Sequence, residues 1–264
     1  MHLSTLKPHF SKFFPSLLIL LVASILSGCM NGSEVDERLE SIRDAKRAPG
    51  TSAKEILSEE KFKSIWLEVH YMEGFPPSAS ALSNLEDWIL KHTNKSQGLE
   101  LTLKEIPAAG QDNYSVTEVR EIEDQNRTAY NFGNKLGMYI LILDGYYEKD
   151  TDTQASLGFA YRNTSIALMG KRVDERSGGF AKPDLETLET TVLEHEFGHL
   201  MGLVNLGASM VNEHEDDDNS GHCDNGECLM YWAVESSYIY NHFGGEVPKL
   251  GANCLADLKA AGGK

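Results

Sequence analysis

Strand-like and helix-like stretches alternate along most of this chain, and this alternation restricts the fold more than any other feature. Met138–Leu143 is an uninterrupted apolar run, which is typical of a central strand buried on both faces. Ile65–Met72 and Leu99–Leu103 also have strand character, and apolar residues recur at helical spacing between residues 82 and 89. A second helix is expected over Val116–Tyr130. This order favours a layered α/β or α+β domain over an all-helical bundle.

Two further strand-like segments, Leu157–Tyr161 and Ser165–Met169, flank a connection of three residues. Connections of this length join antiparallel strands in hairpins. The sheet is therefore expected to end in an antiparallel pair, and we assign the chain to the α+β class.

A helix is expected to begin after Asp184, whose side chain can cap it, and to stop at Gly202. It contains His195-Glu196-Phe197-Gly198-His199, in which the two imidazoles lie about one turn apart on one helix face. Two histidines at this spacing can bind one Zn²⁺, and Glu196 can take a proton from a water molecule that the zinc has made more acidic. Because zinc also polarises a carbonyl group, the pattern predicts hydrolysis of a peptide or a related amide.

The composition is acidic. The chain has 24 Lys and Arg against 40 Asp and Glu, which gives a formal net charge of -16. A strongly negative protein repels a phosphate backbone, so we expect no nucleic-acid partner. With 264 residues, 41% of them hydrophobic, the chain is long enough for one medium-sized domain with a sizeable core.

The amino terminus resembles a bacterial lipoprotein signal. Lys7 and Lys12 are followed by the apolar stretch Leu17–Ile25 and then by Leu26-Ser27-Gly28-Cys29. The apolar stretch is shorter than the roughly 20 residues that a spanning helix needs. In signals of this kind the cut falls before the cysteine, which implies a lipid on Cys29 and attachment to the bacterial cell envelope. Whether the periplasmic or the surface face of the outer membrane carries it stays open.

The zinc motif also resembles a known family. His195-Glu196-Phe197-Gly198-His199 followed by Gly202 is similar to the opening of the metzincin motif, in which the glycine lets the chain turn and return a third histidine ligand. Asn205 stands where metzincins have that histidine, and an amide is a poor zinc ligand. The third ligand must therefore come from elsewhere in the chain.

Downstream, residues 222–230 have the His-Cys, four residues, Cys-Xaa-Met spacing of archaemetzincins. This resemblance implies that His222 is the third zinc ligand and that Met230 belongs to the turn that floors the zinc site. His214 is the alternative ligand, but it lies in the acidic run Glu213–Asp218, which is expected to be a solvated loop. The resemblance further implies a metzincin-like fold. Such a fold has a mixed twisted sheet, an active-site helix and a small C-terminal subdomain with a Met-turn, and the substrate lies along the edge strand.

Archaemetzincins also have a C-terminal Cys-Xaa-Xaa-Cys that completes a second, structural zinc site. Here only Cys254 is available, so we expect no second site and a disulfide instead. Its pairing among Cys223, Cys228 and Cys254 stays open.

The sequence thus predicts a signal peptide over residues 1–28, a tether over 29–60 and a zinc metallopeptidase domain over 61–264. The protein is expected to be a monomeric metalloendopeptidase with a peptide or protein substrate. Two alternatives remain: an inactive metal-binding lipoprotein module, which the missing histidine at Asn205 favours, and a zinc amidase acting on cell-wall peptides. The presence of Glu196 favours an enzyme, because only the hydrolysis needs that carboxylate.

Overall fold

The computed structural model describes residues 32–151, 155–179, 182–235 and 245–264. Cys29 and the signal segment lie outside the described residues. The chain divides into two compact units, Met1–Asp36 and Glu37–Lys264, and the boundary falls inside helix α1 (Gly32–Asp44). The second unit contains the sheet and the residues of the candidate site. Among the described residues, no helix combines the length and the apolar character needed to cross a bilayer.

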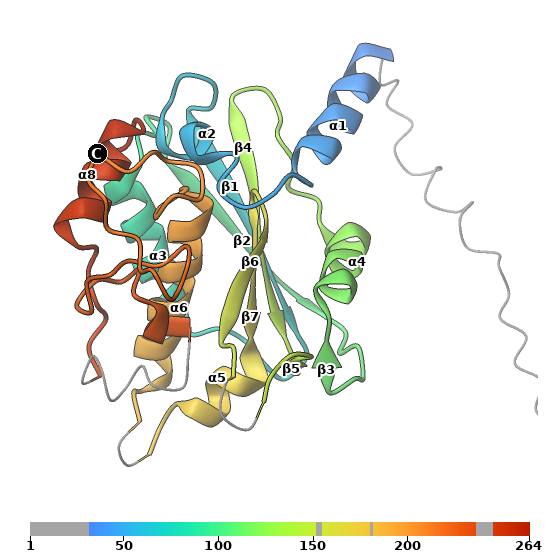
Figure 1. Cartoon of the computed structure of the whole chain (residues 1–264). Coiled ribbons are helices and arrows are strands. Elements are labelled where there is room, and N and C mark those ends of the chain that lie inside the picture. Colours follow the sequence, from blue (N-terminus) through green and yellow to red (C-terminus); the bar gives the residue numbers. More distant parts are fainter. Residues whose placement is uncertain (1–31, 152–154, 180–181, 236–244) are drawn as a thin grey trace, which may run out of the picture. The chain divides into compact units, whose positions relative to one another are not determined.

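A mixed sheet of five strands forms the centre of this unit (Figure 1), in the order β2-β1-β4-β7-β6. Its first four strands run parallel, and β6 pairs antiparallel with β7 at the edge, which confirms the predicted mixed sheet. The strands are β1 (Ser64–Met72), β2 (Leu99–Ile106), β4 (Lys135–Leu143), β6 (Gly158–Arg162) and β7 (Ser165–Met169). Two short strands, β3 (Asn113–Tyr114) and β5 (Tyr146–Tyr147), form a separate parallel pair.

The central strand β4 is buried from Leu136 to Leu143, as its apolar run predicted. Its side chains alternate between two hydrophobic cores, one on each face of the sheet, because successive residues of a strand point to opposite faces. Met138 and Ile140 belong to the larger core, and Tyr139 and Leu141 belong to the smaller one.

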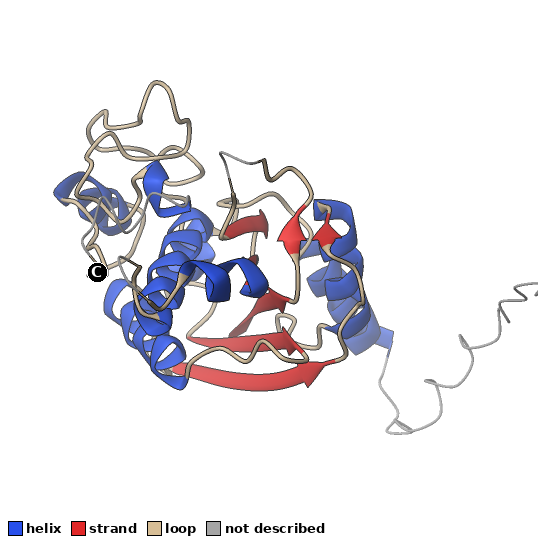
Figure 2. Cartoon of the chain, turned by 90° about the horizontal axis from the view of Figure 1, so that it is seen from below, coloured by secondary structure: helices blue, strands red, loops and turns tan. Residues whose placement is uncertain are grey.

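Helices cover both faces of the sheet, as Figure 2 shows. α3 (Ala79–His92), α6 (Leu185–Leu200) and α8 (Ala252–Ala260) contribute buried side chains to the larger core, and α4 (Val116–Asn126) contributes Val119 to the smaller one. The remaining helices are α2 (Ala53–Leu57), α5 (Gly170–Arg176) and the 3-10 helix η1 (Trp232–Glu235). α6 therefore lies against the sheet on the side of the larger core.

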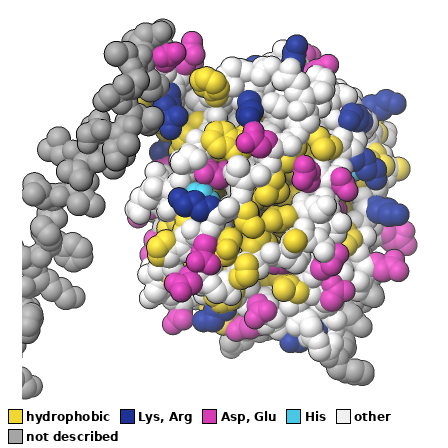
Figure 3. All heavy atoms as spheres, turned by 180° about the vertical axis from the view of Figure 1, so that it is seen from behind, with side chains coloured by type: hydrophobic (Ala, Val, Ile, Leu, Met, Phe, Trp, Pro, Cys, Tyr) yellow, Lys and Arg dark blue, Asp and Glu magenta, His cyan; other side chains and the backbone are white. Residues whose placement is uncertain are grey.

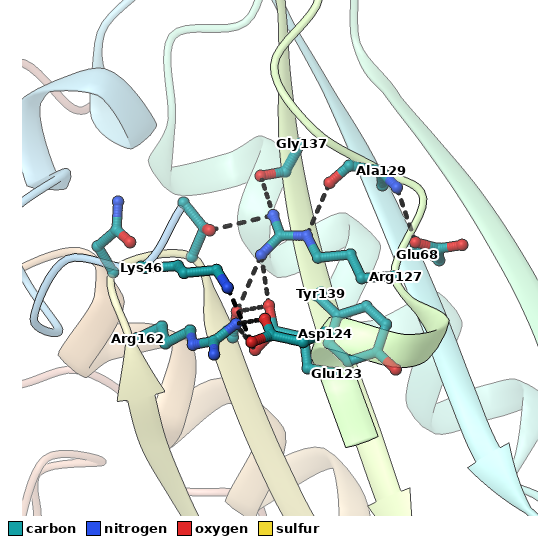
Figure 4. Close-up of polar contacts among 12 residues, drawn as sticks. Lys46, Glu68, Glu123, Asp124, Arg127, Ala129, Gly137, Tyr139 and Arg162 are labelled. Atoms are coloured by element: carbon teal, nitrogen blue, oxygen red, sulfur yellow. Dashed lines mark hydrogen bonds and ion pairs between the residues drawn. The ribbon is translucent and has the colours of Figure 1, made fainter. Parts of the chain in front are cut away.

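Helix α4 is shorter than predicted: it ends at Asn126, not at Tyr130. Arg127 leaves the helical backbone conformation (φ -62°, ψ 133°), and its guanidinium donates to the carbonyl oxygens of Ala129 and Gly137 (Figure 4). The sequence pattern continues the helix, but these hydrogen bonds to carbonyl oxygens outside the helix satisfy donors of a buried guanidinium.

The same buried polar cluster fixes α4 to the sheet. Arg127 forms an ion pair of 2.7 Å with Glu123, and both side chains are fully buried. Arg162, at the end of β6, lies 3.0 Å from Glu123 and 2.7 Å from Asp124 (Figure 4). Removal of one partner would leave a buried charge uncompensated. Because Arg162 belongs to β6 and its partners belong to α4, these ion pairs hold the end of β6 against α4.

The folded unit includes residues that we expected in the tether. Between positions 45 and 57 the buried apolar residues are Ala45, Ala53, Ile56 and Leu57. The buried ammonium of Lys95 donates at 2.8, 2.5 and 2.8 Å to the carbonyl oxygens of Glu55, Ser58 and Phe62. The packed structure therefore begins before the boundary that we placed at residue 61.

Figure 3 shows the molecule from the side of edge strand β2. Acidic and basic side chains are interspersed on this face around a group of apolar side chains. Leu101 of β2 is half-buried, and Leu103 is 47% exposed. Among the side chains visible on this face, basic residues form no continuous patch.

Candidate metal centre

Helix α6 carries the predicted motif and is buried over most of its length. It begins after Asp184, whose carboxylate accepts a hydrogen bond of 2.7 Å from the backbone N–H of Thr187, as predicted. Every residue from Leu188 to Leu200 is buried. Gly202, with φ +79°, follows the helix in the left-handed conformation that ends it. The histidines of α6 therefore project from a rigid element.

Three histidines meet at this helix. The Nε2 atoms of His195 and His199 lie 3.0 Å apart, and a ring nitrogen of His222 lies within 4.8 Å of the ligand atoms of both. A tetrahedral zinc with Zn–N distances of about 2.0–2.1 Å separates two nitrogen ligands by about 3.3 Å. The structure thus brings His222 to the helix histidines, and the three side chains form a group that could hold a metal ion.

The carbonyl group of Leu229 orients the first of these histidines. His195 Nδ1 lies 2.7 Å from the Leu229 oxygen, so the N–H of the ring is on Nδ1 and Nε2 keeps its lone pair. Zinc-binding histidines in proteins are held by such a hydrogen bond on the opposite ring nitrogen. This contact supports His195 as a metal ligand.

Met230 lies directly against the middle of the motif. A Cβ atom added to Gly198 would lie 2.4 Å from Met230 Sδ. The Met230 side chain therefore occupies the space that a side chain at position 198 would need. Met230 is fully buried, and its carbonyl oxygen accepts a 2.8 Å hydrogen bond from the backbone N–H of Cys223. Met230 therefore packs against Gly198 of the motif and bonds to Cys223, the residue that follows His222.

Glu196 is 1% exposed and lies beside edge strand β6. A Cβ atom added to Gly158 would lie 2.8 Å from Val192 Cγ1 and 3.3 Å from Glu196 Cγ, so only glycine lets the strand approach the helix this closely. The glutamate of the motif thus lies beside the antiparallel edge strand of the sheet.

A second carboxyl group of α6, that of Glu194, is also buried. Burial raises the pKa of Glu194 to about 8, and Lys91 partly offsets this. At neutral pH Glu194 is mostly protonated, so it adds little negative charge to the helix beside the histidines.

The side chain of Asn205, at the position where metzincins have a histidine, is hydrogen-bonded to another residue. Its side-chain amide donates to Glu215 at 3.1 Å, and its backbone adopts a left-handed conformation with φ +64°. Asparagine tolerates this conformation better than most residues.

The structure also contains a second cluster, which we did not predict. Ligand atoms of His214, Cys223 and Cys254 lie within 4.8 Å of one another, and Cys228 Sγ lies 3.5 Å from Cys254 Sγ. We call these four residues the thiol cluster. All three cysteines are free and buried, so the expected disulfide was wrong. Tertiary contacts bring a histidine to the thiols, whereas the sequence had led us to expect no second site.

Asp257 explains why His214 belongs to this cluster. His214 Nε2 lies 2.7 Å from Asp257 Oδ2, and both side chains are fully buried. Nδ1 of the same ring is buried and has no hydrogen-bond partner among the described residues. Asp257 follows Cys254 by one helical turn on α8, a Cys-Xaa-Xaa-Asp spacing that could have indicated this site.

This structure is similar to solved structures to different degrees. Archaemetzincin from Methanopyrus kandleri superposes with a TM-score of 0.50 at 14% sequence identity, over 75% of this chain and 96% of the other. Metalloproteinase-II from Bacteroides fragilis gives a TM-score of 0.38 at 13% identity, over 77% of this chain and 54% of the other, so the chain spans about half of that protein. No protein-family model matches the sequence, and no curated protein matches it either.

The likeness to archaemetzincin shows the fold alone. This chain has a metallopeptidase-like fold with a mostly parallel sheet and an antiparallel edge strand. On that fold it carries two groups of histidine and cysteine side chains that can hold metal ions.

Proposed function

We propose that this protein is a zinc-dependent peptidase of the bacterial cell envelope, in which His195, His199 and His222 hold the metal and Glu196 is the catalytic base. The observation that carries the proposal is the convergence, within 4.8 Å, of nitrogens from two histidines of α6 and from His222 of the loop beside it, where α6 also carries the buried Glu196. The metallopeptidase-like fold supports it.

Zinc bound by the histidines supplies a Lewis acid that makes water more acidic and polarises the scissile carbonyl group. Glu196 accepts the proton of the attacking water and then donates it to the leaving amine. Because its side chain is 1% exposed, this proton passes to the reacting groups and not to bulk solvent. Met230 supports the helix from below as the Met-turn residue.

An extended peptide is the substrate that suits edge strand β6, which has one strand neighbour in the described sheet. Its free edge can pair with substrate backbone, and such pairing is independent of side-chain identity. Gly158 of this strand lies beside Glu196, so a bound peptide would pass the catalytic base. A cavity of about 370 Å³ flanks the same strand and is lined by residues that include Arg120, Tyr147 and Phe159. It can receive one side chain of the peptide.

The thiol cluster supports a second, structural zinc ion. Three cysteine sulfurs and one imidazole make a complete tetrahedral ligand set, which leaves no position for water or substrate. The buried Asp257 carboxylate satisfies the other nitrogen of His214, as in known zinc sites. A metal there contributes to folding and not to chemistry. This proposal replaces our expectation of a disulfide.

Lipid attachment through Cys29 would hold the monomeric enzyme at the membrane, where it meets peptide or protein substrates. The lipoprotein-like sequence of residues 1–28 supports this location.

Glu196→Gln tests the proposed function. The variant should keep its zinc after dialysis against a weak chelator, because all three histidines remain, and should lose about 10²–10⁴-fold in peptide turnover. Glu194→Gln is the matched control, since it makes the same change two residues away on the same buried helix and should keep turnover within a factor of a few.

Near wild-type turnover by Glu196→Gln would remove the catalytic assignment. A wild-type protein that binds zinc but cleaves no member of a broad peptide library, and no cell-wall peptide amide, would indicate an inactive metal-binding module. Cleavage confined to cell-wall peptide amides would indicate an amidase.

A further inference from the structure

We propose that the thiol cluster positions the third ligand of the catalytic centre, so that the histidine site binds zinc tightly only after a metal has filled the cluster. His214 is then a positioning residue of the catalytic centre although it is not one of its ligands. This inference rests on the two metal sites of the proposed function and adds a linkage between them.

The two sites share one stretch of chain. His222 belongs to the histidine site and its neighbour Cys223 belongs to the thiol cluster. In the same way, Cys228 of the cluster is followed directly by Leu229, whose carbonyl oxygen orients His195, and by Met230. Each of these two cluster cysteines is therefore adjacent in sequence to a group that shapes the histidine site.

Hydrogen bonds couple these neighbours further. The backbone N–H of Met230 lies 3.4 Å from Cys228 Sγ, and the N–H of Cys223 donates to the Met230 carbonyl at 2.8 Å. The N–H of Asp224 donates to the His214 carbonyl at 2.9 Å. A shift of the thiols therefore moves the backbone that presents both His222 and the carbonyl group that holds His195.

His222 lies in an irregular segment of the chain. Between Leu200 and Trp232 the described chain contains no helix and no extended strand. The backbone of His222 is held by contacts inside its own loop, namely an N–H donated to Asn219 at 3.1 Å and a carbonyl oxygen that accepts from Asp216 at 2.8 Å. A long irregular segment of this kind gains its order from cross-links.

A metal in the thiol cluster would supply such cross-links. It would join His214, the Cys223–Cys228 loop and Cys254 of α8, three parts of the chain that are far apart in sequence. Without it, the loop samples conformations in which His222 is away from the helix histidines. The affinity of the histidine site then falls in proportion to the population of the competent conformation. By thermodynamic reciprocity, zinc at the histidine site must also strengthen binding at the cluster.

Titration of the metal-free, full-length protein with Co²⁺ tests this order. Thiolate ligands give cobalt a charge-transfer absorption that histidine ligands do not give, so the two sites are distinguishable. The thiolate charge-transfer band should grow with the first equivalent of Co²⁺. The absorption of cobalt bound by the histidines should grow only with the second equivalent. His214→Ala should lower the zinc affinity of the histidine site by about 10- to 100-fold, the range of ordinary coupling between sites. His214→Cys should restore it, because a fourth thiolate can complete the cluster.

Asp217→Ala, at an exposed acid of the same loop, is the matched control and should leave both affinities unchanged. If the histidine site fills first, or with the same affinity whether the cluster is filled or empty, the linkage is refuted. The Co²⁺ titration of the wild-type protein tests the linkage even if His214→Ala fails to fold. These measurements record metal binding and not cleavage, so they are separate from the Glu196→Gln test. Failure to bind metal at either site would remove the proposed function as well.

Discussion

The contact between Gly198 and Met230 gives a quantitative test of the floor of the metal centre. In Gly198→Ala the new methyl group would lie 2.4 Å from Met230 Sδ and 3.1 Å from Met230 Cε, in a region where both residues are buried. Overpacking of a core costs about 1–3 kcal/mol. Alanine is favoured over glycine inside a helix by about 1 kcal/mol. The net loss of unfolding free energy is therefore expected to be about 0–2 kcal/mol.

The second arm of the test removes the opposing side chain. Met230→Ala alone leaves a cavity and should cost about 2–5 kcal/mol. In that background Gly198→Ala meets no sulfur, so the helix preference remains and the second substitution should stabilise by up to about 1 kcal/mol. The difference between the two backgrounds equals the overpacking cost, so the coupling energy is about 1–3 kcal/mol.

Urea unfolding of the four proteins, with and without zinc, measures this coupling. Met169→Ala is the control for Met230→Ala, because Met169 is also a fully buried methionine but lies in the core on the other face of the sheet. Gly198→Ala and Met169→Ala should be additive within about 0.5 kcal/mol. Additivity of Gly198→Ala with Met230→Ala would show that Met230 does not support the helix at this point.

Two further predictions concern acid stability and the lipid anchor. Burial alone raises the pKa of Glu68, but hydrogen bonds from His70, Thr128 and Ala129 outweigh it and lower the pKa from 4.5 to about 2. This group therefore stabilises the fold above pH 4.5 by about 3 kcal/mol, and the contribution is lost as the pH falls from 4.5 towards 2. Glu68→Gln should remove that part of the pH dependence in urea unfolding, and an unchanged acid slope would contradict the assignment. Cys29→Ser should abolish lipid labelling and leave an unprocessed precursor, whereas unchanged labelling would exclude Cys29 as the anchor.

Local patterns in the sequence predicted the elements that position the metal site. Apolar runs placed β1, β4 and the hairpin of β6 and β7 within a few residues of their observed bounds. A capping residue and a terminal glycine predicted the ends of α6. These features could be predicted because helix and strand periodicity, caps and turns depend on neighbours within a few positions.

Contacts between distant parts of the chain decided the rest. The end of α4 at Asn126 depends on a guanidinium that binds carbonyl groups outside the helix, and the buried ammonium of Lys95 binds the carbonyl oxygens of Glu55, Ser58 and Phe62. His214 belongs to the thiol cluster because Asp257, 43 positions away, accepts a hydrogen bond from its ring. The spacing of the cysteines alone was compatible with a disulfide, and only the fold shows that His214 lies beside them. Sequence periodicity carries no information on which side chains meet after the chain has packed, because that depends on tertiary burial and on the need to satisfy buried polar groups.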